Sequence, residues 1–197
     1  MFDDVELRIK KKNKILFSRE SKSLQNLQGA ICRQTHLTLV FWAFDCLQIP
    51  MRELMLKYPE ESDIQSAYDV CLAWAHGTVK MPPAKKAILH CHAVAKRLHN
   101  DYDIALCHAV GQGCAAVHVE THALGLVFYE LTALVIQCGY LNYEEIVSEK
   151  ISCYAHRLAW WEANAEQYRF QEKWADFLLR PEAENKEKVL NKKLSEK

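Results

Sequence analysis

Nine histidines are the side chains in this sequence with the clearest capacity for chemistry. An imidazole changes its charge near neutral pH, and its ring nitrogens bind metals or move protons. His108, His118 and His122 lie in one stretch of few charges that runs from Asp101 to Gly139. If this stretch forms one helix, the three rings lie within an arc of roughly 80°. They could then share a ligand with side chains from a neighbouring helix.

A metal site would need ligands from more than one helix. His118 and His122 are one turn apart, about 6 Å along a helix axis, which suits two ligands of one ion. His108 is about 15 Å from His118 on the same axis, so a single ion cannot bind both. The third ligand would have to come from elsewhere, and the candidates are His92, His76 and Asp45. Hydrogen-bonded structural histidines are the commoner case. The sequence therefore predicts no metal and no cofactor, with His118 and His122 as the ligands if a metal is bound.

The motifs of familiar enzyme sites are missing from the sequence. The segment HVETH at 118–122 is not HExxH, because its glutamate has the wrong offset for a base that activates water. There is no GxSxG, no Walker loop and no GxGxxG. Cys107-His108 and Cys91-His92 are sequence neighbours, which point in different directions on a helix. We therefore predict no catalytic residue and a protein that is not an enzyme.

The composition limits the partners and the compartment. Lysine plus arginine and aspartate plus glutamate both number 25, so the chain has no net charge with which to hold nucleic acid or a membrane surface. No run is long and apolar enough to span a membrane, and the first residues do not resemble a signal peptide. Most of the eight cysteines lie in apolar helical patterns without a CxxC pair, which is typical of reduced thiols. We expect a cytoplasmic protein that binds neither nucleic acid nor membrane.

The elements that must position these residues are helices. Apolar residues recur every three or four positions in the ranges 36–58, 62–77, 82–99 and 142–179. Pro50 should kink or restart the first of these helices near Gln48. A turn at Glu120-Thr121 should divide the stretch 101–139 into two helices. The prediction is an all-α, single compact domain of about six or seven helices, as an antiparallel bundle or stacked helix hairpins, with a long C-terminal helix.

Three segments follow from these patterns: a charged N-terminal lead-in at 1–24, a helical domain at 25–180, and a charged, disordered tail at 181–197. The lead-in is expected to be loosely structured or a short helix. Gly111 and Gly113 each weaken a helix by about 1 kcal/mol relative to alanine, so a neighbouring backbone or a ligand should come close there. The apolar seam from Val147 to Tyr168 should lie across the other helices or bind a second copy, which would give a homodimer. The adjacent Trp160 and Trp161 cannot both face the same partner.

Several short motifs occur in an order that resembles a known family. They are Phe41-Trp42-Ala43, Ala73-Trp74-Ala75-His76-Gly77, His92-Ala93, Cys107-His108-Ala109-Val110-Gly111, and His118 followed by Thr121-His122-Ala123. Over roughly residues 35–135 the chain is similar to the putative immunity protein family of bacterial polymorphic-toxin loci, whose members are alanine-rich helical domains. The resemblance implies a protein that binds and neutralises a co-encoded toxin.

Two functions remain open from the sequence. One is an immunity protein that blocks its cognate toxin without catalysis, and the other is a helical protein, or an enzyme, that binds a metal or a small ligand through a histidine cluster. The histidines are either structural or open to a pocket. The candidate pocket residues are Trp42, Asp45, Trp74, His92, His108, His118 and His122.

Overall fold

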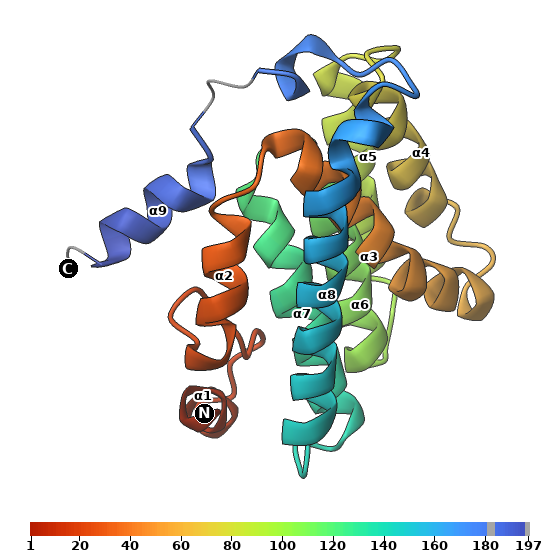
Figure 1. The fold of residues 1–197 in the computed structure, drawn as a ribbon. Helices are drawn as coiled ribbons and strands as arrows, with labels where there is room; N and C mark the ends of the chain where they lie inside the picture. The colour runs from red at the N-terminus through yellow and green to blue at the C-terminus, as the bar shows by residue number, and fades with distance from the viewer. Residues whose placement is uncertain (181–183, 196–197) are drawn as a thin grey trace.

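The computed structural model describes residues 1–180 and 184–195, and in these ranges it contains helices and no strand (Figure 1). The α-helices are α1 (Asp3–Lys10), α2 (Gln25–Ile31), α3 (His36–Lys57), α4 (Asp63–Ala75), α5 (Met81–Val94), α6 (Asp101–Ala115), α7 (Thr121–Gln137), α8 (Glu144–Arg169) and α9 (Lys186–Ser195). The all-α prediction is confirmed. The two helices beyond the expected seven, α1 and α9, lie in the predicted lead-in and tail. None of the helices in the described ranges has the length and hydropathy that crossing a membrane requires.

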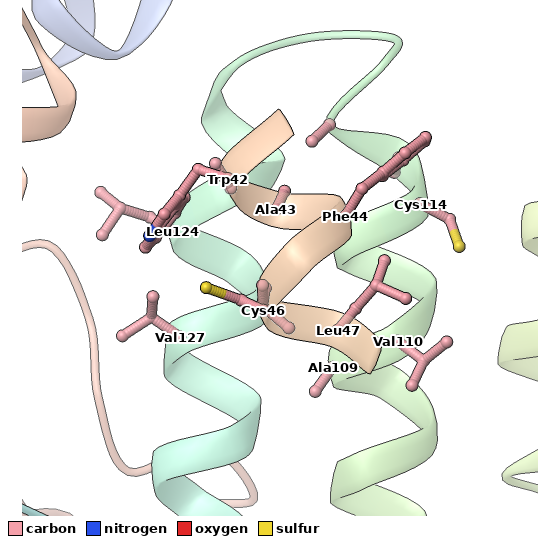
Figure 2. Close-up of a cluster of buried hydrophobic side chains, with 14 of the residues drawn as sticks. Trp42, Ala43, Phe44, Cys46, Leu47, Ala109, Val110, Cys114, Leu124 and Val127 are labelled. Atoms are coloured by element: carbon pink, nitrogen blue, oxygen red, sulfur yellow. The ribbon is translucent and has the colours of Figure 1, made fainter. Parts of the chain in front are cut away.

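The centre of the domain is formed by α3, α6 and α7. In Figure 2, α3 crosses the other two helices, with Trp42 directed toward α7 and Leu47 toward α6. Both side chains are completely buried. A Cβ atom on Gly113 of α6 would lie 2.8 Å from Leu47 Cδ2, so only glycine permits this approach. A close neighbour was predicted at Gly113, but it is a side chain of α3 and not a backbone or a ligand.

Helix α3 continues without interruption through Pro50, which corrects the predicted restart near Gln48. Proline costs roughly 3 kcal/mol inside a helix because it lacks an N–H group and crowds the preceding turn. Pro50 is buried, and α3 packs against α4, α6, α7 and α8. Burial of so much of its surface outweighs the local cost, which periodicity alone could not reveal.

The ends of several helices follow local chemistry. Asn100 caps α6, because its side-chain oxygen accepts hydrogen bonds from the N–H groups of Tyr102 and Asp103. Gly77 and Gly139, which follow α4 and α7, have φ angles of 74° and 60°, a region that glycine adopts readily. Helix α5 ends at Val94, several residues before the predicted end near residue 99.

The apolar seam of α8 is used inside the molecule. Its buried residues Val147, Tyr154 and Leu158 face the core, and the helix packs against α2, α3 and α7. Trp42 Nε1 donates to the backbone oxygen of Tyr154 at 3.1 Å. The helix ends at Arg169 instead of continuing toward residue 179. A homodimer through this helix, which stays a prediction, would have to use its outer side.

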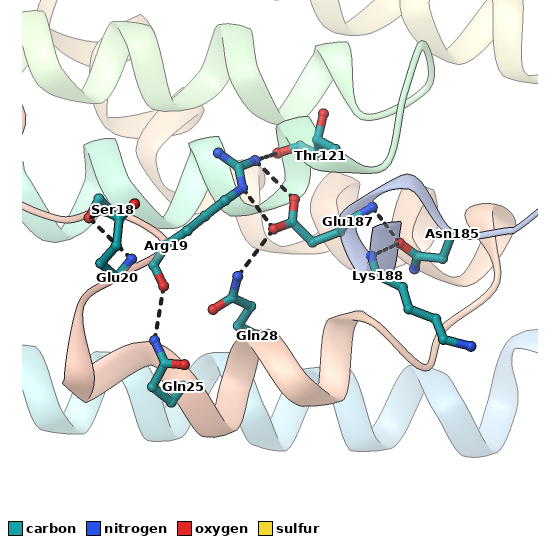
Figure 3. Close-up of polar contacts among 9 residues, drawn as sticks. All are labelled: Ser18, Arg19, Glu20, Gln25, Gln28, Thr121, Asn185, Glu187 and Lys188. Atoms are coloured by element: carbon teal, nitrogen blue, oxygen red, sulfur yellow. Dashed lines mark hydrogen bonds and ion pairs between the residues drawn. The ribbon is translucent and has the colours of Figure 1, made fainter. Parts of the chain in front are cut away.

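Hydrogen bonds and an ion pair connect the N-terminal segment to the tail (Figure 3). Arg19 donates two hydrogen bonds to Glu187, at 2.7 and 2.9 Å, and a third to the backbone oxygen of Thr121 at 3.2 Å. Glu187 is completely buried, and Asn185 donates to two backbone oxygens next to α2. The prediction of a disordered tail is therefore wrong for residues 184–195, because composition does not show a distant partner. Residues 181–183 and 196–197 of that tail lie outside the described residues.

Candidate functional site

A hydrogen-bonded pair of histidines, His92 on α5 and His108 on α6, connects these two helices. Their Nδ1 atoms are 3.0 Å apart, and their ring centroids are 5.2 Å apart. A Cβ atom on Gly111 would lie 2.5 Å from His92 Cε1, so this glycine makes room for an imidazole ring. The ring of His108 also lies 5.1 Å from that of Tyr129 on α7. The pair thus joins three consecutive helices through polar side chains.

A second polar contact joins α6 and α7 beside this pair. His122 Nδ1 lies 2.7 Å from Gln112 Oε1, and because a carbonyl oxygen only accepts, the ring nitrogen donates. Gly125 of α7 makes room for Gln112, since a Cβ atom there would lie 2.3 Å from Oε1. His122 also contributes to the lowered pKa of His92. The structure therefore gathers three of the predicted histidines, His92, His108 and His122.

His118 lies on a different element from these three histidines, although its charge contributes to the lowered pKa of His122. Helix α6 ends at Ala115 and α7 begins at Thr121, so His118 lies in the connecting segment. It is exposed, and its ring lies 6.0 Å from that of Trp74. The two-ligand spacing considered for His118 and His122 required one continuous helix, and that condition is not met. Within residues 1–180 and 184–195, no group of three or more His, Cys, Asp or Glu side chains could hold a metal ion.

Burial favours the neutral form of the three gathered imidazoles. Desolvation is the largest cause in each case, and together with the charges of His108 and His122 it lowers the pKa of His92 to about 4. Burial also lowers the pKa of His108, with help from Lys14, and the pKa of His122. Such rings are weak bases near neutral pH. Their arrangement is suited to hydrogen bonding more than to proton transfer.

A cleft with a volume of about 670 Å³ opens beside His108. Its walls come from residues 9–16, from α6 and from α7, which are distant in the sequence. Aliphatic side chains form much of the wall, and the polar lining residues include Lys12, Lys14, His108 and Tyr129. His108 thus belongs both to the histidine pair and to an open pocket. The sequence left open whether the histidines are structural or open to a pocket. The answer differs from one histidine to another.

The remaining predicted pocket residues lie in other places. Trp42 is in the core of the domain. Asp45 lies between α3 and α8, where it accepts hydrogen bonds from Arg157 at 2.9 Å and from Trp161 Nε1 at 3.2 Å. Trp74 packs against His118 and against Phe177. The seven residues do not line one pocket, because neighbouring positions on one helix face different elements.

A further surface runs along the outer side of α8. Of its residues, only Trp160 was singled out in the sequence. The surface consists of five exposed residues at intervals of three or four, and we name it the α8 stripe: Glu145, Glu149, Ser152, His156 and Trp160. Its first four residues, with Cys153 and Arg157, line a shallow depression of about 640 Å³. Trp160 is 47% exposed. The signal for it in the sequence is a polar repeat on the side of the helix opposite the apolar seam.

Neighbouring aromatic rings hold Trp160 in place. Its ring packs edge-on against Trp161 at 4.8 Å and against Tyr168 at 5.8 Å. Trp161 is turned inward, where it stacks on Phe41 at 5.0 Å. Of the two adjacent tryptophans, one is therefore part of the packing and the other is presented to solvent. An aromatic side chain that is both ordered and exposed is well suited to anchor a partner.

A family profile described as "Imm-5 like putative immunity protein" matches residues 29–157, which is more than half of the chain. The matched segment runs from α2 into α8 and ends just before Trp160. It includes the histidine pair and most of the α8 stripe. No curated protein and no solved structure is significantly similar to the chain.

Proposed function

We propose that this chain, which belongs to the family of Imm-5 like putative immunity proteins, binds a protein toxin and neutralises it without catalysing a reaction. Family membership supports the class of function. The toxin would be encoded beside the immunity protein, so that a cell making the toxin also makes its antidote. Neutralisation requires only that the complex form and that it cover the toxin's active surface.

The observation that carries the proposal is the α8 stripe. Its tryptophan stands at one end of an exposed helix face that the domain itself leaves uncovered. Tryptophan is enriched among the few residues that supply most of the binding energy in protein interfaces. The rest of the stripe is polar, as the rim around such an anchor usually is. We infer that the toxin docks along α8 with Trp160 in a pocket of its own surface.

Charge indicates what the toxin surface should be like. Glu145 and Glu149 are exposed and have no ion-pair partner within the described ranges, whereas the basic residues of the same helix are engaged. Lys150 is bound to the buried Glu130, and Arg157 is bound to Asp45. The stripe therefore presents uncompensated negative charge. Complementary potentials speed association and select partners, so the toxin should present lysine or arginine to it.

A cytoplasmic location agrees with this function. All eight cysteines are free, and five of them are completely or nearly completely buried: Cys46, Cys71, Cys91, Cys107 and Cys114. Buried thiols that pack as small apolar groups are usual in proteins from reducing compartments. Under this proposal the protein meets the toxin in the cytoplasm, either before or after the toxin is delivered.

Co-expression tests the proposal directly. The toxin domain encoded next to this chain is expressed from an inducible promoter, with and without the full-length chain, and growth is followed. We expect growth to be rescued, and a one-to-one complex of the two purified proteins to elute together in size-exclusion chromatography. Cells that die at the same rate in both cultures, or two proteins that elute separately, would reject the proposal.

A further inference from the structure

The cleft beside His108 has the size and surface of a small-molecule site. Its volume of about 670 Å³ lies within the range of about 300–1,000 Å³ that is usual for such sites. Its apolar wall includes Ile9, Ile15, Ile104 and Ile136. No residue of α8 lines it. A ligand could therefore occupy the cleft without touching the surface proposed to bind the toxin.

Lysines make this cleft attractive to an anion. Lys12 and Lys14 line it, and neither forms an ion pair in the part of the chain that the structure describes. Asp101 is the acidic residue in the lining. The positive charge of Lys14 reaches the inner wall, since it helps to lower the pKa of His108. An anionic group would be attracted to the rim, where solvent screens the interaction but does not remove it.

The backbone conformation at Lys12 belongs to the end of α1. Lys12 has a φ angle of 54°, and its N–H donates to the backbone oxygen of Ile9 at 2.9 Å, next to the end of α1. This conformation is strained for a lysine and is adopted without strain by glycine. The N–H group of Asn13 also donates to the backbone oxygen of Arg8 at 3.0 Å, and the two hydrogen bonds form the Schellman pattern that ends α1. The end of this helix therefore holds Lys12 in the lining of the cleft.

Two uncharged groups that line the cleft have hydrogen-bonding atoms without a partner in the described residues. His108 uses Nδ1 for His92, and its Nε2 has no partner among the residues described. If His92 is the donor in that bond, His108 carries its proton on Nε2 and donates into the cleft. The hydroxyl group of Tyr129 has no hydrogen-bond partner in the same ranges, and burial raises its pKa, so it stays protonated as a donor. Both groups suit an oxygen of the ligand.

We propose that this cleft binds a small organic carboxylate with an aliphatic or aromatic body. The carboxylate lies between Lys12 and Lys14, and the apolar body lies against the isoleucines. A ligand with a further hydroxyl or carbonyl oxygen on its body would also accept hydrogen bonds from His108 and Tyr129. The ligand would make the immunity protein responsive to a metabolite, which is a property beyond toxin binding.

Isothermal titration calorimetry of the full-length protein tests the proposal with four probes: octanoate, 3-phenylpropionate and the two matching neutral amides. We expect at least one carboxylate to bind. Its amide should bind more weakly by a factor of about five or more, because the amide lacks the charge that the lysines attract. The double variant K12Q/K14Q should weaken carboxylate binding by a similar factor of about five. The matched control is K10Q/K11Q, on the same segment but outside the lining, and it should bind like the unchanged protein. Failure of both carboxylates to bind at millimolar concentration, or equal binding of acid and amide, would overturn the proposal.

The growth assay separates this proposal from toxin neutralisation. K12Q/K14Q should rescue growth as well as the unchanged chain does, since the cleft lies apart from the α8 stripe. If K12Q/K14Q loses rescue while K10Q/K11Q keeps it, the cleft is part of the toxin interface and the carboxylate proposal is overturned. Equal losses in carboxylate binding from both double variants would also overturn it, because the effect would then be general electrostatics. Loss of rescue by every form of the chain would instead contradict the proposed function.

Discussion

The cleft and the α8 stripe are two candidate binding surfaces of one small domain, and they differ in shape, in charge and in how they are assembled. The cleft is concave, is lined by lysines and uncharged imidazole and phenol groups, and is assembled from three distant segments. The stripe is exposed, acidic and aromatic, and it comes from a single helix. A concave apolar site with few polar groups suits a small molecule, whereas a ridge with an aromatic anchor suits a protein. This difference predicts that the two proposed functions can be separated by substitution.

The largest predicted effect comes from replacing Glu187 by alanine, which should destabilise the segment beside the cleft and leave α8 almost unchanged. Glu187 binds Arg19, which follows the segment that forms one wall of the cleft (Figure 3). Removing one partner of a buried ion pair costs about 3 kcal/mol, because the other charge loses its compensation. We expect the free energy of unfolding to fall by that amount in urea denaturation. Hydrogen exchange should increase at residues 9–16 and remain slow in the middle of α8.

The control for this prediction is E184A, three residues earlier. Glu184 is exposed and has no hydrogen bond or ion pair in the described ranges. Its replacement should change the free energy of unfolding by less than about 0.5 kcal/mol. Equal effects of E184A and E187A, or faster exchange in α8 than in the N-terminal segment, would show that the two regions are not built independently.

The next largest effect should come from W160A, which should weaken toxin binding and leave stability almost unchanged. Truncating an aromatic anchor costs about 2 kcal/mol of binding free energy, which is roughly a 30-fold loss of affinity. Stability should change little, since Trp160 is half exposed. The control is L56A, which removes an apolar side chain that is 85% exposed on α3. Toxin affinity is measured by calorimetry, and equal losses from both variants would remove Trp160 from the interface.

Local signals in the sequence determined most of the fold. The cap at Asn100, the prolines at the start of α5 and the glycines after α4 and α7 mark helix ends through the chemistry of the residues themselves. Of the kink or restart predicted at Pro50, the restart does not occur, because the cost of one proline is small beside the packing of a central helix. Interactions between distant residues decided that case, and such interactions are not visible in a periodic pattern.

The candidate site could be predicted only in part for the same reason. Gly111 indicated a close neighbour, but the neighbour is His92 from another helix. His118 was grouped with His122 because spacing on an ideal helix was extended across residues 116–120, where the chain turns. The buried contact of Glu187 with Arg19 joins residues that lie near opposite ends of the chain. Spacing identifies residues on one element, and only the fold shows which elements meet.

Charge on the α8 stripe should have a smaller effect that depends on salt. The double variant E145Q/E149Q removes two uncompensated carboxylates from the depression on α8. We expect toxin association to slow about tenfold at low ionic strength, and this difference to shrink near 0.5 M salt because exposed charges are screened. The control E60Q/D69N removes two exposed carboxylates from a different part of the surface. Association rates from surface plasmon resonance that fall equally for both pairs would indicate that net charge, not the stripe, steers the toxin.

The smallest predicted effect concerns acid and should be specific to the histidine group. Burial, with the nearby His108 and His122, lowers the pKa of His92 to about 4 in the folded protein, while an unfolded chain has a value of about 6.5. Below pH 6.5 the unfolded state therefore binds the proton more readily than the folded state does. Stability contributed by the neutral ring is fully present above pH 6.5 and is lost as the pH falls toward 4. The lowered pKa values of His108 and His122 act in the same direction.

The variant H92N isolates this effect, because asparagine retains hydrogen-bonding atoms and does not titrate. Between pH 7 and pH 5 the unchanged protein should lose about 1 kcal/mol more stability than H92N does, a value that allows for the partial exposure of the ring. Urea denaturation at the two pH values measures the difference. The control H99N replaces an exposed histidine just beyond α5 and should retain the pH dependence of the unchanged protein. An H92N protein that loses as much stability in acid as the unchanged protein would show that His92 is not the group that responds. The acid sensitivity would then be assigned to other groups, first of all to His108 and His122, whose pKa values are also lowered by burial.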